Sequence, residues 1–151
     1  ARAAGPAGMV GGQAFDLASD GEMAIGREGM ELLHHSKTGV IFKAAIDMAA
    51  IVAEASPQQR QALDAYASYM GLTFQITDDI LDVVGDEALL GKPVGSDARN
   101  DKATYVTIFS LDEARRMACE AADKAVQALE PLGPKAWFLK ELVENLLVRV
   151  H

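Results

Sequence analysis

The sequence predicts an all-α protein with about five main helices and little or no strand. Half of its 151 residues are hydrophobic, and alanine is the most common of them, which favours helix. Helix-capping signals also precede long segments in which apolar residues recur three or four positions apart. The length suits one domain with a hydrophobic core, and no domain boundary is visible within residues 1–151.

The first two helices are predicted at residues 9–19 and 28–55. Ser19-Asp20-Gly21 ends the first of them. Within the second, Gly39 follows Ser-Lys-Thr, so we expect a kink or local break near residues 36–39.

The third helix has the clearest start. Ser56 suits the N-cap, Pro57 suits the first helical position, and Gln59 can close a capping box. This helix is predicted to run to residue 84, where Gly85 ends it, and residues 85–102 are predicted as a loop rich in glycine and charge.

Two further helices are predicted after the loop. Ser110 and Glu113 form a second capping-box pattern, opening a helix that ends near Leu129. The last helix covers about residues 135–150. One face is predicted to be apolar, with Phe138, Leu139, Leu142, Leu146 and Val150.

The net charge of −8 argues against nucleic acid or an anionic membrane surface as the main partner. The best apolar run, residues 40–53, is broken by Lys43 and Asp47, so no membrane span is predicted. Cys119 is the only cysteine and cannot form an internal disulfide. A reducing, cytoplasmic location is therefore expected.

An acidic cluster on the third helix is the strongest functional signal. Its polar stripe contains Gln75, Asp79, Asp82 and Asp86, with Asp78 beside it. No Lys, Arg or His lies between Arg60 and Lys92, so the neutralising charge must come from elsewhere. Carboxylates suit Mg²⁺, whereas zinc would require nearby His or Cys. The alternative is a solvated acidic helix face.

Basic residues near this cluster favour a diphosphate ligand. Lys92, Arg99 and Lys102 follow in the loop, and Lys37 and Thr38 lie at the predicted helix break. A metal ion could bridge carboxylate and phosphate while the lysines neutralise the remaining phosphate charge.

Four blocks of the sequence resemble the trans-isoprenyl diphosphate synthases, especially the bacterial farnesyl diphosphate synthase (geranyltranstransferase) type. They are GGQAFDL at 11–17, HSKTG at 35–39, GLTFQITDDILD at 71–82, and GKPVGSD at 91–97 with DKATY at 101–105. The resemblance implies an all-α isoprenoid-synthase fold with a helix-lined cavity. It also implies Mg²⁺-dependent condensation of isopentenyl diphosphate with an allylic diphosphate, geranyl or dimethylallyl, giving a product such as farnesyl diphosphate.

The same resemblance implies roles for individual residues. Asp78, Asp79 and Asp82 match the family's second aspartate-rich motif, which holds Mg²⁺. The matches to catalytic residues are Lys37, Thr38 and Gln75. The matches to substrate-binding residues are Lys37, Lys92, Lys102, Phe74, Gln13 and Asp16.

The chain departs from the family pattern in one respect. Family members are longer and carry a first aspartate-rich motif upstream, together with basic residues for isopentenyl diphosphate. Neither is present here. We therefore expect residues 1–151 to be the C-terminal part of a single polyprenyl synthase domain, inactive alone and homodimeric in the full-length enzyme.

Two alternatives stay open. A non-catalytic interaction subunit with this fold is disfavoured by the presence of Lys37, Gln75 and the three aspartates. A terpene cyclase relative is disfavoured by the block at residues 91–102. Assays of chain elongation against cyclisation would separate the second alternative from a prenyltransferase.

Overall fold

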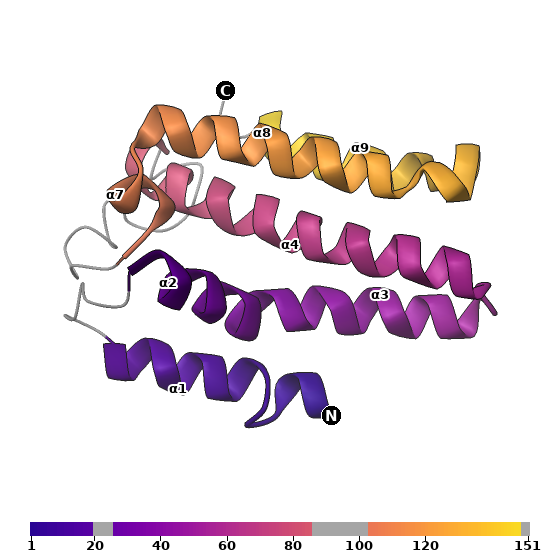
Figure 1. Cartoon of the computed structure of the whole chain (residues 1–151), viewed down its shortest axis with the longest axis horizontal. Coiled ribbons are helices and arrows are strands. Elements are labelled where there is room, and N and C mark those ends of the chain that lie inside the picture. The colour runs from indigo at the N-terminus through magenta and orange to yellow at the C-terminus, as the bar shows by residue number, and fades with distance from the viewer. Residues whose placement is uncertain (20–25, 86–102, 149–151) are drawn as a thin grey trace.

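The computed structural model describes residues 1–19, 26–85 and 103–148, and it confirms the all-α prediction. Within these ranges there is no strand. The long helices lie side by side in the order α1, α2 with α3, α4, and α8 with α9 (Figure 1). Helix α4 lies between α3 and α8 and packs against both, so it is the central element on which the predicted site depends.

Helix α1 (Met9–Ser19) follows a short 3₁₀ turn, η1 (Arg2–Ala4), and its start and end agree with prediction. It packs against the turn that carries Lys37. A Cβ atom at position 12 would lie 2.6 Å from the backbone nitrogen of Lys37. Only glycine permits this close approach of the two backbones.

The predicted break in the second helix is a π-helical turn. Helix α2 (Gly26–His34) leads into the π turn η3 (His35–Gly39), which continues as α3 (Val40–Val52). Single π turns inside α-helices are frequent at functional sites. The break therefore places Lys37 and Thr38 on irregular backbone, as the sequence suggested.

Helix α4 (Pro57–Val84) begins with the predicted capping box. The Ser56 hydroxyl accepts from the Gln59 backbone N–H at 3.3 Å, and the Gln59 side chain accepts from the Ser56 N–H at 2.9 Å. Two apolar clusters bury this helix. The cluster toward its start includes Tyr66, Met70, Ala125, Leu129 and Val143. The cluster toward its end includes Met30, Ile76, Ile80, Tyr105 and Ala114.

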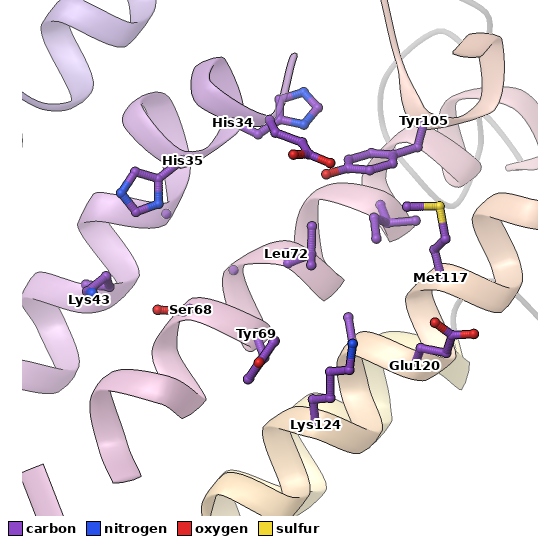
Figure 2. A pocket seen from close by; sticks show the side chains of 15 residues that line it. His34, His35, Lys43, Ser68, Tyr69, Leu72, Tyr105, Met117, Glu120 and Lys124 are labelled. Atoms are coloured by element: carbon purple, nitrogen blue, oxygen red, sulfur yellow. The ribbon is translucent and has the colours of Figure 1, made fainter. Parts of the chain in front are cut away.

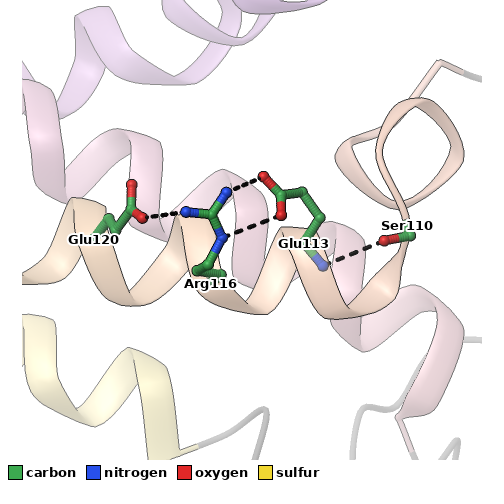
Figure 3. Close-up of polar contacts among 4 residues, drawn as sticks. All are labelled: Ser110, Glu113, Arg116 and Glu120. Atoms are coloured by element: carbon green, nitrogen blue, oxygen red, sulfur yellow. Dashed lines mark hydrogen bonds and ion pairs between the residues drawn. The ribbon is translucent and has the colours of Figure 1, made fainter.

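The capping box predicted at Ser110 is only half correct. After the short helix α7 (Tyr105–Ile108), Ser110 accepts from the Glu113 N–H at the start of α8 (Leu111–Ala128). The Glu113 carboxylate does not return to Ser110, because it accepts two hydrogen bonds from the Arg116 guanidinium, which also binds Glu120 (Figure 3). A bidentate guanidinium–carboxylate contact is stronger than one bond to a neutral backbone N–H.

The apolar face predicted for the last helix is partly wrong. The 3₁₀ segment η4 (Glu130–Ala136) precedes α9 (Trp137–Val148) and sets the rotation at which it starts. Val143 and Leu146 are buried, whereas Phe138 remains 57% exposed and Leu142 36% exposed. Residue 150 lies outside the described residues. None of the described helices is both long and apolar enough to cross a membrane.

Candidate functional site

Lys37 and Asp16, both predicted substrate-binding residues, meet in the structure. The Lys37 Nζ lies 2.6 Å from Asp16 Oδ2, joining η3 to α1. Both residues are half-buried, as is Gln13 on the same helix as Asp16. The contact orients the lysine ammonium group, because the glycine contact at position 12 keeps the two backbones close.

The predicted metal ligands lie on the last turns of α4. Asp79 and Asp82 are each 3% exposed, while Asp78 is half-buried. Asp79 is held from two sides, since Gln75 Nε2 donates to Oδ1 at 3.2 Å and the Tyr105 N–H donates to Oδ2 at 2.8 Å. These two bonds fix the orientation of the carboxylate before any ligand arrives.

The donor set suits an ion that is completed by its ligand. Among residues 1–19, 26–85 and 103–148, no three His, Cys, Asp or Glu side chains lie close enough to hold a metal ion together. Mg²⁺ usually takes one or two carboxylates, with water and substrate phosphates in the remaining positions. One or two carboxylates from Asp78, Asp79 and Asp82 would fit that pattern with the ligand, and the metal role of these residues stays a prediction.

Other predicted residues lie beside these groups. Thr38 is half-buried on η3, which packs on α4, and a Cβ atom at position 71 would lie 3.5 Å from the Cα atom of Gly39. The Phe74 ring packs against Phe42 with 5.3 Å between centroids, so it forms part of the α3–α4 packing. Lys92 and Lys102 lie outside the described residues.

A cavity of about 430 Å³ lies between α2–η3–α3, α4 and α8 (Figure 2). Its lining includes the apolar residues Leu72 and Ile76 and charged residues such as Lys43 and Lys124. The Lys124 ammonium group lies 5.9 Å from the centroid of the Tyr69 ring. The predicted site residues do not line this cavity, but Gly39 and Ile76 are sequence neighbours of Thr38 and Gln75.

His34, the last residue of α2, was not among the predicted site residues, and the structure gives it a specific place. Its Nδ1 is buried without a hydrogen-bond partner in the described part of the chain. Burial is the largest cause that lowers the pKa of His34 to about 4; nearby Lys37 also lowers it, and Asp16 and Asp78 each raise it by a smaller amount. One signal was available, because His34 follows the fully buried Met30 by four residues, which places both on one helix face.

Tyr105 ends the DKATY block of the family resemblance, where the sequence left lining of the loop and packing both open, and it was not among the predicted site residues. It is 1% exposed, and its ring lies 5.6 Å from the ring of His34 between centroids. Thr104 caps this short helix by accepting from the Thr107 N–H at 3.1 Å. The Thr104–Thr107 spacing was a local signal for the helix, but nothing in the sequence links Tyr105 to Asp79, 26 residues earlier.

Comparison with known proteins decides the family. Residues 6–132 match the Polyprenyl synthetase family. The chain belongs to this family. It is 40% identical over 146 residues to farnesyl diphosphate synthase of Geobacillus stearothermophilus and 42% identical over 139 residues to that of Escherichia coli (strain K12). These matches cover 95% and 90% of this chain, and 49% and 46% of the relatives.

The fold comparison agrees with this membership of the polyprenyl synthetase family. A geranyltransferase from Helicobacter pylori, solved in complex with magnesium and isoprenyl diphosphate, superposes with a TM-score of 0.80 at 29% identity. The match covers 97% of this chain and 48% of that one. The chain therefore spans about half the length of the relatives that it matches.

Proposed function

We propose that this chain supplies the side of the active site that binds the allylic diphosphate in a Mg²⁺-dependent prenyltransferase. The full reaction would join isopentenyl diphosphate to geranyl or dimethylallyl diphosphate, giving a short-chain product such as farnesyl diphosphate. The observation that carries the proposal is the preset carboxylate of Asp79, held by Gln75 and Tyr105 within the Asp78-Asp79-x-x-Asp82 motif. The names of the relatives support the same chemistry.

The diphosphate would be recognised by charge on both sides. Asp78, Asp79 and Asp82 would hold Mg²⁺, which when bound supplies positive charge that stabilises the departing diphosphate. Lys37 would contact the phosphate oxygens directly, joined by Lys92 and Lys102. Asp16 keeps the Lys37 ammonium group in place without ligand, so little reorganisation is needed on binding.

The allylic cation would be stabilised by dipoles on α4 and η3. The Gln75 amide donates its N–H to Asp79, so its carbonyl oxygen is left for the positive charge that develops on carbon. The Thr38 hydroxyl, on the adjoining π turn, would add a second oxygen dipole. Phe74 would support the wall through its packing against Phe42.

The hydrocarbon part of the substrate needs an apolar, water-poor space, because water would quench the cation. Leu72 and Ile76, which line the cavity, would provide such a surface, and Ile76 directly follows Gln75 in the sequence. We further propose that the chain corresponds to the C-terminal part of a polyprenyl synthase domain. On this proposal it works in the cytoplasm, within a homodimer, and the facing wall binds isopentenyl diphosphate.

Calorimetric titration with geranyl thiodiphosphate, an unreactive allylic analogue, tests the proposal on the chain as it stands. Binding is expected with Mg²⁺ and should be lost when EDTA replaces the metal. Absence of Mg²⁺-dependent binding by a folded chain would contradict the proposed function. Separately, this chain alone should not incorporate radiolabelled isopentenyl diphosphate into a longer product. Turnover would show that the residues of this chain are sufficient for catalysis.

A further inference from the structure

A continuous line of contacts links α2 to the predicted metal site. The ring of His34 lies against the ring of Tyr105, as Figure 2 shows at one end of the cavity. The backbone N–H of Tyr105 donates to Asp79 Oδ2 at 2.8 Å in a buried hydrogen bond. The last residue of α2 thus contacts the group that orients a carboxylate on α4.

The ring of Tyr105 is packed on several sides. It lies in the apolar cluster with Met30 and Ile80, and it stacks on Phe109 with 6.2 Å between centroids. His34 covers another part of the same ring. A backbone N–H can keep a 2.8 Å bond only if its residue does not shift, so packing on the ring supports the geometry at Asp79 together with the hydrogen bonds of α7.

The chemistry of His34 agrees with a packing role. The buried Nδ1 of His34 has no hydrogen-bond partner among the described residues, and such a nitrogen normally costs stability. With its pKa lowered to about 4 by burial, the imidazole is neutral near pH 7 and can lie against an aromatic ring without bringing a charge into the core.

We propose that His34 is a positioning residue: its ring keeps Tyr105 in place, and Tyr105 in turn orients Asp79 for the Mg²⁺–diphosphate ligand. The first link is a property of the protein alone, whereas the second rests on the proposed function. Groups that orient a metal-binding carboxylate typically contribute about 10- to 100-fold in affinity.

Hydrogen exchange by NMR tests the first link without any ligand. In His34→Ala, the Tyr105 amide should exchange at least about 10-fold faster, because the hydrogen bond to Asp79 opens more often. The amide of Tyr66, in the other apolar cluster on α4, should be unaffected. His34→Phe restores a ring without the buried nitrogen and should restore slow exchange at Tyr105. If His34→Ala does not fold, His34→Gln keeps side-chain volume without a ring and takes its place.

The second link is tested by titrating the same variants with geranyl thiodiphosphate and Mg²⁺. We expect His34→Ala to bind about 10-fold more weakly and His34→Phe to bind like the wild type. Unchanged Tyr105 exchange in His34→Ala, failure of His34→Phe to restore it, or equal acceleration at Tyr66 would overturn the inference. If the wild type showed no Mg²⁺-dependent binding, the proposed function and the second link would fail, while the exchange result would still decide the first.

Discussion

The first half of α4, residues 57–70, is held by apolar packing, whereas residues 71–84 also carry carboxylates oriented by individual hydrogen bonds. Tyr66 and Met70 lie in a cluster with Leu129 and Val143, where many apolar contacts together stabilise the helix. Asp79, in contrast, accepts directional hydrogen bonds from Gln75 and Tyr105. Changes in the first half should therefore alter stability, and changes in the second should alter ligand binding.

Met70→Ala should have the largest effect. Removing this buried side chain should lower the free energy of unfolding by about 3 kcal/mol, because it leaves a cavity in the cluster. Urea denaturation followed by circular dichroism measures the change, with the exposed Ser68→Ala as control. Binding of geranyl thiodiphosphate to the folded variant should stay within about twofold of wild type. A large loss of affinity would show that the halves of α4 are coupled.

Replacing Asp78 and Asp82 together by alanine should weaken Mg²⁺-dependent diphosphate binding by about 100-fold or more, or about 2.7 kcal/mol. Metal-free stability should be retained or raised, because like charges four residues apart repel each other on a helix. Calorimetry and urea denaturation give the two readouts. Asp123→Ala, an exposed acidic position on α8, is the matched control. Unchanged metal-dependent affinity in the double variant would remove the metal role.

Acidification should weaken the fold through His34. Its pKa is about 4 in the folded protein and 6.5 when unfolded, so protons bind preferentially to the unfolded chain below pH 6.5. The penalty is absent above that pH, reaches about 1.4 kcal/mol at pH 5.5 and stops growing below pH 4. Urea denaturation at pH 7.5 and 5.5 measures it. His34→Gln should remove this pH-dependent part, and His35→Gln, at an exposed neighbour, should retain it.

Tyr66→Phe should have the smallest effect. The hydroxyl donates to the backbone oxygen of Leu139 at 2.8 Å, and burial raises the Tyr66 pKa to about 12. Losing the hydrogen bond should cost about 1 kcal/mol of unfolding free energy while ring packing persists. Tyr69→Phe, at a half-buried ring that lines the cavity, serves as control. A cost above that of Met70→Ala would reverse the view that packing, not hydrogen bonding, dominates in this half.

Local sequence signals predicted the helices well. Ser56, Pro57 and Gln59 define the start of α4 within four residues, so no distant contact is needed to interpret them. The same reasoning failed for Phe138, because the rotation of α9 depends on the preceding 3₁₀ segment and on packing against α4 and α8.

The sequence predicted which residues make up the candidate site, but it did not predict the contacts that hold them in position. The aspartates, Lys37 and Gln75 were identified from residue type and spacing, together with the family resemblance. The bond from Tyr105 to Asp79 and the ring contact with His34 were not, because they join three separate helices. Such contacts depend on how the helices cross, which periodicity within one helix does not determine.

The π turn at His35–Gly39 also sets the rotation of α2 about the helix axis relative to α3. One residue advances an α-helix by about 100°, and a π turn accommodates an extra residue without ending the helix. If these five residues rewound as regular α-helix with none removed, α2 would rotate by about that angle relative to α3. His34 would then leave the ring of Tyr105 even though every side chain named in the site was still present. The π turn therefore determines which face of α2 packs against the rest of the bundle.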